Sequence, residues 1–137
     1  MIVPILNKES TAQELANLCW LLIEANAVCD DKNIRWKIAQ LAGTADELNE
    51  KFLDEHSLQP LNPSKHQKDF IDKLSEEEKL EILLSFAFQS AATLDYAQYK
   101  EFEPSKKFSD TIKLISREAL TLLHEKRRWR KEEESSD

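Results

Sequence analysis

The sequence contains one glycine, four prolines and two cysteines among 137 residues. So few turn-forming residues exclude the many tight turns of a β-sandwich or β-barrel, and a single glycine excludes a glycine-rich phosphate-binding loop. The longest unbroken apolar run covers residues 18–23, far short of the roughly 20 residues that cross a membrane. Residues 1–6 are apolar but follow no cationic region, so we expect no secretory signal. We therefore expect a helical, cytoplasmic protein without a membrane segment.

The cysteines and histidines are too scattered to suggest a metal site or a disulfide. Cys19 and Cys29 lie in or beside one predicted helix, where ten residues of rise would separate them by about 15 Å. That distance is too long for a disulfide. None of the three histidines, His56, His66 and His124, has metal-ligand spacing to a cysteine. We expect neither a metal nor another cofactor.

Acidic residues outnumber basic ones, with 26 Asp and Glu against 19 Lys and Arg and a net charge of -7. Residues 117–131 contain six Lys or Arg and two Glu, which is a net charge of +4, whereas residues 132–137 carry -4. Because nucleic-acid affinity depends on neutralising phosphates, this acidic chain could contact nucleic acid only through its basic C-terminal helix. We expect a single domain over residues 1–131 and an acidic, disordered tail over residues 132–137.

Apolar residues recur every three or four positions in several stretches, which predicts helices. The four long stretches cover residues 10–26, 34–52, 75–96 and 108–129, and a shorter one covers residues 65–74. The proline-containing residues 57–64 form the clearest loop. The pattern predicts an all-α fold: an antiparallel helical bundle of four main helices plus one or two short helices.

Local signals predict where these helices begin and end. Ser10 and Thr11 each precede a Gln or Glu by three positions, which is the capping-box spacing, so the first helix is predicted to start there. Ser75 has the same relation to Glu78. Gly43, followed by another capping sequence, predicts a break or kink in the second helix. The candidate caps of that helix are Asp30, Asp31 and Asn33.

Arg117 and His124 lie seven residues apart in the last predicted helix. At about 100° per residue they project from nearly the same side, two turns apart. This stretch is similar to the R-x4-6-H signature of the HEPN ribonucleases, all-α domains that often act as dimers in prokaryotic defence. The resemblance implies metal-independent RNA cleavage with both residues at the scissile phosphate. The alternative is that these cations only complement the dipole of the helix C-terminus.

Acidic pairs on two predicted helices carry a second resemblance. Glu47, Glu50 and Asp54 precede a second pair, Glu78 and Glu81. They resemble the paired carboxylates of all-α nucleotide pyrophosphohydrolases of the MazG type. The resemblance implies Mg²⁺ held between facing helices and the phosphates of a nucleotide. Solvated helix faces and capping glutamates are the alternative interpretation.

Two tryptophans, Trp36 and Trp129, are candidate interaction residues. Trp36 lies nearly opposite the stripe of its helix, so either a second neighbour buries it by approaching Gly43, or it belongs to an exposed patch. Trp129 lies between Arg128 and Arg130 at the end of the last helix, which we expect to extend beyond the core. Trp and Arg are enriched among the residues that dominate interface energies. A solvated helix end is the alternative for the C-terminal group.

These observations favour a small acidic protein, prokaryotic or from a phage, that binds another protein or associates with itself. We expect a regulatory, adaptor or assembly subunit without catalytic activity. Its predicted interaction residues are Trp36, Arg128, Trp129 and Arg130. The HEPN-like and MazG-like activities are the enzymatic alternatives, and each requires the structure to bring its own residues together.

Overall fold

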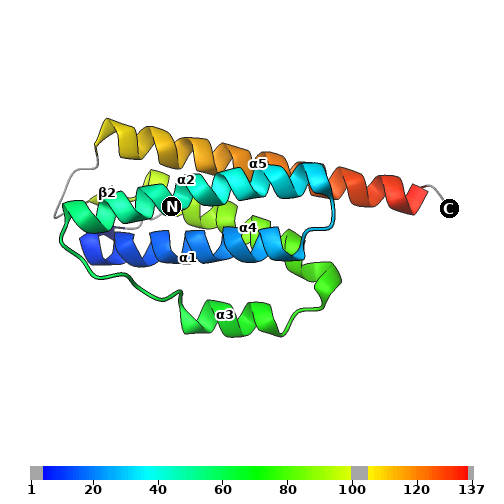
Figure 1. The fold of residues 1–137 in the computed structure, drawn as a ribbon, viewed down its shortest axis with the longest axis horizontal. Coiled ribbons are helices and arrows are strands. Elements are labelled where there is room, and N and C mark those ends of the chain that lie inside the picture. The colour runs from blue at the N-terminus through cyan, green and yellow to red at the C-terminus, as the bar shows by residue number, and fades with distance from the viewer. Residues whose placement is uncertain (1–4, 100–104, 136–137) are drawn as a thin grey trace.

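A computed structural model describes residues 5–99 and 105–135, and only the backbone of residues 5, 98–99 and 129–135. The described part contains five helices and one pair of very short strands (Figure 1). In chain order, the elements are β1 (Ile5–Leu6), α1 (Lys8–Val28), α2 (Lys32–Glu55), α3 (Lys65–Asp72), α4 (Glu76–Tyr96), β2 (Gln98–Tyr99) and α5 (Lys106–Ser135). The predicted all-α fold is confirmed, with one addition. The strands β1 and β2 form a two-residue parallel pair that the sequence pattern did not indicate.

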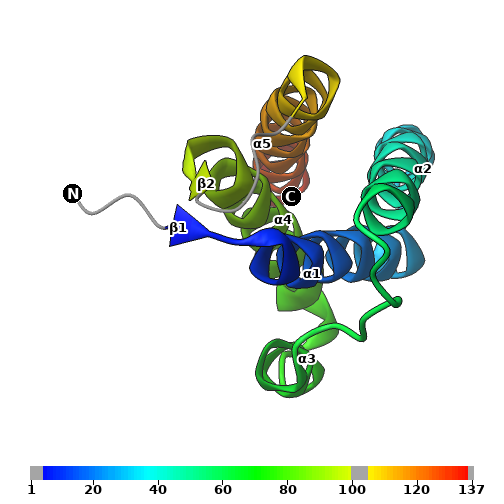
Figure 2. The ribbon, with the colours of Figure 1, turned by 90° about the vertical axis from the view of Figure 1, so that its left-hand side faces the viewer.

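The four long helices pack on one another around a single hydrophobic core. Helix α1 packs on α2 and α4, and α5 packs on the same two helices. The short α3 lies outside this group, against α4 and on the side away from α5 (Figure 2). None of the described helices has the length and apolar character needed to span a bilayer.

Helix α1 is central to the core because it is apolar on more than one side. Leu15, Leu18, Leu21 and Leu22 have no exposed surface. Two adjacent buried leucines, Leu21 and Leu22, point about 100° apart, so one neighbouring helix could not cover both well. The packing of α1 on both α2 and α4 provides the two covered sides.

The predicted start of α1 at Ser10 or Thr11 is wrong. The helix begins at Lys8, and Asn7 is its N-cap. The Ser10 backbone N–H donates to Asn7 Oδ1 at 2.8 Å, and the Thr11 hydroxyl donates to the Asn7 carbonyl oxygen at 2.8 Å. Asparagine caps a helix as well as serine does. Thr11 is completely buried, and its hydroxyl bonds back to the cap residue instead of acting as the cap.

The caps of the next long helices are closer to the prediction. Helix α2 follows Asp31, one of the three candidates, whose Oδ1 accepts from the Ile34 N–H at 3.0 Å. Helix α4 follows Ser75, as the capping-box spacing predicts. There, however, the Ser75 hydroxyl donates to Glu78 Oε1 at 2.7 Å, and Ser75 makes no side-chain bond to the helix backbone.

Helix α2 is continuous from Lys32 to Glu55, so the predicted break at Gly43 is wrong. Ile38 and Leu41 before the glycine and Ala45 after it are all buried on one side of the helix. The apolar period therefore continues through Gly43 without a shift. A glycine inside a helix costs only about 1 kcal/mol relative to alanine, which the packing of this stripe outweighs.

We expect Gly43→Ala to raise the free energy of unfolding by about 0.5 to 1 kcal/mol. A Cβ atom at Gly43 would meet nothing within 4 Å, so alanine restricts the unfolded chain without disturbing the folded one. The reverse change at a nearby exposed position, Ala39→Gly, should lower stability by a similar amount. Chemical denaturation of the three proteins measures both effects. A less stable Gly43→Ala protein would contradict the continuous, open helix.

Helix α5 buries the stripe that its sequence predicted. Its buried members are Phe108, Ile112, Ile115, Ala119 and Leu122. Beyond this stripe, the last turns of α5 extend past the ends of the other helices (Figure 1). The bounds of α5 include residues 132–135, and the division into a domain at 1–131 and a tail at 132–137 stays a prediction.

Polar contacts hold the segment between α2 and α3 against α1. Asn17 of α1 is buried, and its Oδ1 accepts from the Ser64 N–H at 2.7 Å and from Gln13 Nε2 at 3.0 Å. Gln13 Nε2 also donates to the Asn62 carbonyl oxygen at 2.9 Å. Buried polar groups require such partners, so Asn17 fixes the loop across α1 while remaining in the core.

Candidate functional site

The side of α2 that faces away from the core is uncovered. The buried stripe of this helix contains Ile34, Ile38, Leu41, Ala45, Leu48 and Phe52. At about 100° per residue, the opposite side between residues 32 and 50 includes seven exposed residues: Lys32, Trp36, Ala39, Gln40, Gly43, Glu47 and Glu50. We refer to these seven residues as the outer face of α2.

Trp36 is the large apolar side chain of the outer face, and 64% of its surface is exposed. The interpretation that a second neighbour buries it by approaching Gly43 is wrong, since the space at Gly43 is open to 4 Å. Leaving a large apolar side chain in water forgoes roughly 2 kcal/mol of burial free energy. Exposed Trp beside Arg35 and Lys37 is typical of an interface anchor, and its role in binding stays a prediction.

The charges of α2 are separated along the helix. Its first two turns contain three basic residues and no acidic one: Lys32, Arg35 and Lys37. Its last ten residues contain one lysine and five acidic residues: Asp46, Glu47, Glu50, Asp54 and Glu55. The helix dipole favours the opposite order, with acidic residues first and basic residues last. The arrangement therefore does not serve the stability of α2 itself.

The other predicted interaction residues lie at the C-terminal end of α5. Arg128 is exposed. Its neighbour Arg127 contacts α4, where Arg127 Nε lies 3.0 Å from Glu81 Oε1. The backbone of Trp129 and Arg130 belongs to α5, but their side chains lie outside the described residues. An interface formed by Arg128, Trp129 and Arg130 stays a prediction.

The residues of the HEPN resemblance lie on α5, and both Arg117 and His124 are exposed. Arg117 lines a hollow of about 470 Å³ between α4 and α5, together with Asp95, Tyr96 and Lys113. His124 is two turns away and does not line this hollow. The hollow that Arg117 lines thus does not bring this pair together at one phosphate.

The carboxylates of the MazG resemblance do not converge. Helices α2 and α4, which carry them, pack on α1 and α5 from opposite sides (Figure 2). Glu78 accepts a hydrogen bond from the Ser75 hydroxyl, and Glu81 forms a salt bridge with Arg127. The part of the chain that the structure describes contains no group of three or more His, Cys, Asp or Glu side chains placed to hold a metal.

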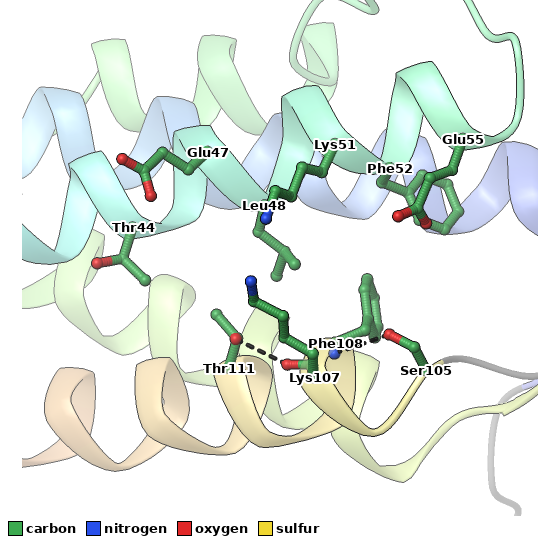
Figure 3. A pocket seen from close by; sticks show the side chains of 10 residues that line it. All are labelled: Thr44, Glu47, Leu48, Lys51, Phe52, Glu55, Ser105, Lys107, Phe108 and Thr111. Carbon is green, nitrogen blue, oxygen red and sulfur yellow. Dashed lines mark hydrogen bonds between the residues drawn. The ribbon is translucent and has the colours of Figure 1, made fainter.

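A pocket of about 170 Å³ between α2 and α5 brings together two lysines that the sequence did not single out. Figure 3 shows the ammonium groups of Lys51 and Lys107 pointing toward each other. The neighbouring Lys51 lowers the pKa of Lys107. Glu47 and Glu55 line the same pocket, so its charge is mixed. No local sequence pattern could reveal this pair, because the two lysines belong to different helices.

Both cysteines are buried thiols. Burial raises the pKa of Cys19 to about 12, and burial also raises the pKa of Cys29. The thiolate is the form that attacks electrophiles and binds metals. Near neutral pH these residues therefore act as small apolar side chains of the core.

Comparison with known proteins does not extend this description. No protein-family model matches the chain, and neither a curated protein nor a solved structure matches it significantly.

Proposed function

We propose that this chain is a non-catalytic helical scaffold of the cytoplasm that acts by binding protein, as a regulatory, adaptor or assembly subunit. In this proposal the four long helices form an antiparallel bundle, which presents binding residues on rigid helical faces. The outer face of α2 is the principal binding surface. The basic end of α5, with Arg128, Trp129 and Arg130, is a second contact with acidic partners.

The observation that supports the proposal is the position of Trp36. The indole is 64% exposed, on the side of α2 that is opposite its buried stripe. Scattered apolar side chains on a surface need no explanation, but tryptophan is the residue type most enriched among interface anchors. Charged residues surround it and would form the polar rim of such an interface.

We expect Trp36→Ala to weaken partner binding about 30-fold or more, which corresponds to the roughly 2 kcal/mol of an interface anchor. The melting temperature should change little, because Trp36 contributes little to the core. The measurement is capture of cross-linked partners from the native cell with the tagged full chain, followed by titration of the recovered partner.

Tyr96→Ala is the matched control. Tyr96 is an aromatic residue of α4 that is 70% exposed and lies outside the outer face of α2. We expect this variant to keep the partner and the affinity of the wild-type protein. The proposal fails if the Trp36→Ala and wild-type proteins recover the same partners with the same affinity, or if neither recovers any protein, itself included.

A further inference from the structure

The outer face of α2 is complementary to itself in shape. Trp36 is the large apolar side chain of this face, and Gly43, two turns later on the same side, has no side chain and nothing within 4 Å of where a Cβ would lie. Two turns correspond to about 10.5 Å along the helix axis. Ala39 and Gln40 lie midway between them. A large side chain and an open position thus lie at equal distances from the centre of one exposed face.

A two-fold axis that passes between Ala39 and Gln40 would place a second copy of α2 antiparallel to the first. Each residue then lies opposite the residue equally far on the other side of the axis. Trp36 of one copy falls opposite Gly43 of the second copy, and the reciprocal contact forms because a two-fold interface repeats every contact. The indole enters the space that the missing side chain leaves.

The same arrangement pairs the charges of α2. Lys32 falls opposite Glu47 of the second copy, and both lie about 11 Å along the helix axis from the two-fold axis. Glu50 of the second copy lies one helical turn beyond its Glu47. Arg35 of one copy and Asp46 of the second copy lie on the same flank of the face. In this register their positions along the helix axis differ by about 3 Å. Among the described residues, none of these side chains forms a salt bridge within one copy.

The helix dipole does not explain the order of these charges, although Glu47 also faces Lys107 of the same copy across the pocket between α2 and α5. Basic residues at its N-terminus and acidic residues at its C-terminus each interact unfavourably with the helix dipole, by about 0.3 to 1 kcal/mol at exposed positions. In an antiparallel pair, the basic half of each helix lies beside the acidic half of the other, so the unfavourable order becomes favourable. Opposite charges in register also select one orientation of the pair.

We propose that the partner of the outer face of α2 is a second copy of this chain, bound antiparallel about a two-fold axis between Ala39 and Gln40. This inference rests on the proposed function and names the partner of the same surface. An interface limited to one helix from each copy lies at the small end of specific interfaces, below about 1,200 Å² in total. The dimer is therefore reversible and depends on protein concentration and salt.

Reciprocal charge reversal tests the register. Lys32→Glu and Glu47→Lys each place like charges opposite each other at two symmetric positions, so each variant should self-associate about tenfold more weakly than wild type. In an equimolar mixture, one copy of each variant restores opposite charges at both positions. The mixture should associate within about threefold of wild type. Sedimentation of the full chain at low salt, over a range of concentrations, measures all four samples.

Gly43→Met tests the space opposite Trp36. A methionine there should weaken self-association about tenfold or more while the monomer unfolds at the same or a higher temperature, since the position is open in one copy. Thr121→Met, at an exposed position of α5, should leave self-association unchanged.

Two results would overturn the second copy as partner: a wild-type protein that stays monomeric at millimolar concentration, or a mixture of the charge variants that associates no better than either alone. Capture of a different protein that depends on Trp36 would then retain the proposed function and replace only its partner. Loss of both self-association and Trp36-dependent capture would remove the proposed function as well.

Discussion

Replacing Leu22 with alanine should lower the free energy of unfolding by about 3 kcal/mol, within the 2 to 5 kcal/mol typical of buried leucines. Leu22 has no exposed surface, and it lies on α1, which packs on both α2 and α4. The cavity left behind cannot close by moving one helix without disturbing the other contact. Chemical denaturation followed by circular dichroism measures the loss.

The adjacent residue provides the control for this prediction. Ile23 lies on the same helix and is 53% exposed, so Ile23→Ala should cost less than about 1 kcal/mol, because little buried surface is removed. Equal losses for the two variants would mean that α1 does not occupy the centre of the core in solution.

Stability should fall steeply in alkaline solution because of Cys19. Burial raises the pKa of this thiol from 9.0 to about 12, so the unfolded chain releases the proton at lower pH than the folded chain does. Between these two values the unfolded state binds fewer protons, and the free energy of unfolding decreases with pH by about 1.4 kcal/mol per unit. Below pH 9 both states keep the proton, and this effect disappears.

Cys19→Ala separates this effect from the titration of lysines and tyrosines. The variant should be slightly less stable than wild type near pH 7, where a buried sulfur is lost from the core. Above pH 9 the free energy of unfolding of the variant should fall less steeply than that of the wild type. The two slopes should differ by about 1.4 kcal/mol per pH unit, which is the contribution of the missing thiol. Denaturation curves at several pH values measure both slopes. Identical slopes would show that Cys19 is accessible to water in the folded state.

Several features of the fold depended on local sequence alone. The apolar period of α5 places Phe108, Ile112 and Ile115 in the core, as the sequence predicts, because residues at this spacing share one side of any helix. Asp31 caps α2 by accepting a hydrogen bond from the backbone N–H of Ile34, only three positions later. The errors at Asn7 and Gly43 were also local, because several residues can cap a helix and a glycine ends one only when packing does not continue past it.

The sequence by itself determined that the chain is helical, which residues share each helical side, and that Trp36 lies opposite the apolar stripe of its helix. Only the tertiary structure decided which of those sides a neighbour covers. It left the outer face of α2 open, placed Lys51 beside Lys107, and joined Lys37 to Glu125 at 3.0 Å. The physical reason is that helix periodicity depends on residues within two turns, whereas coverage depends on how whole helices pack against one another.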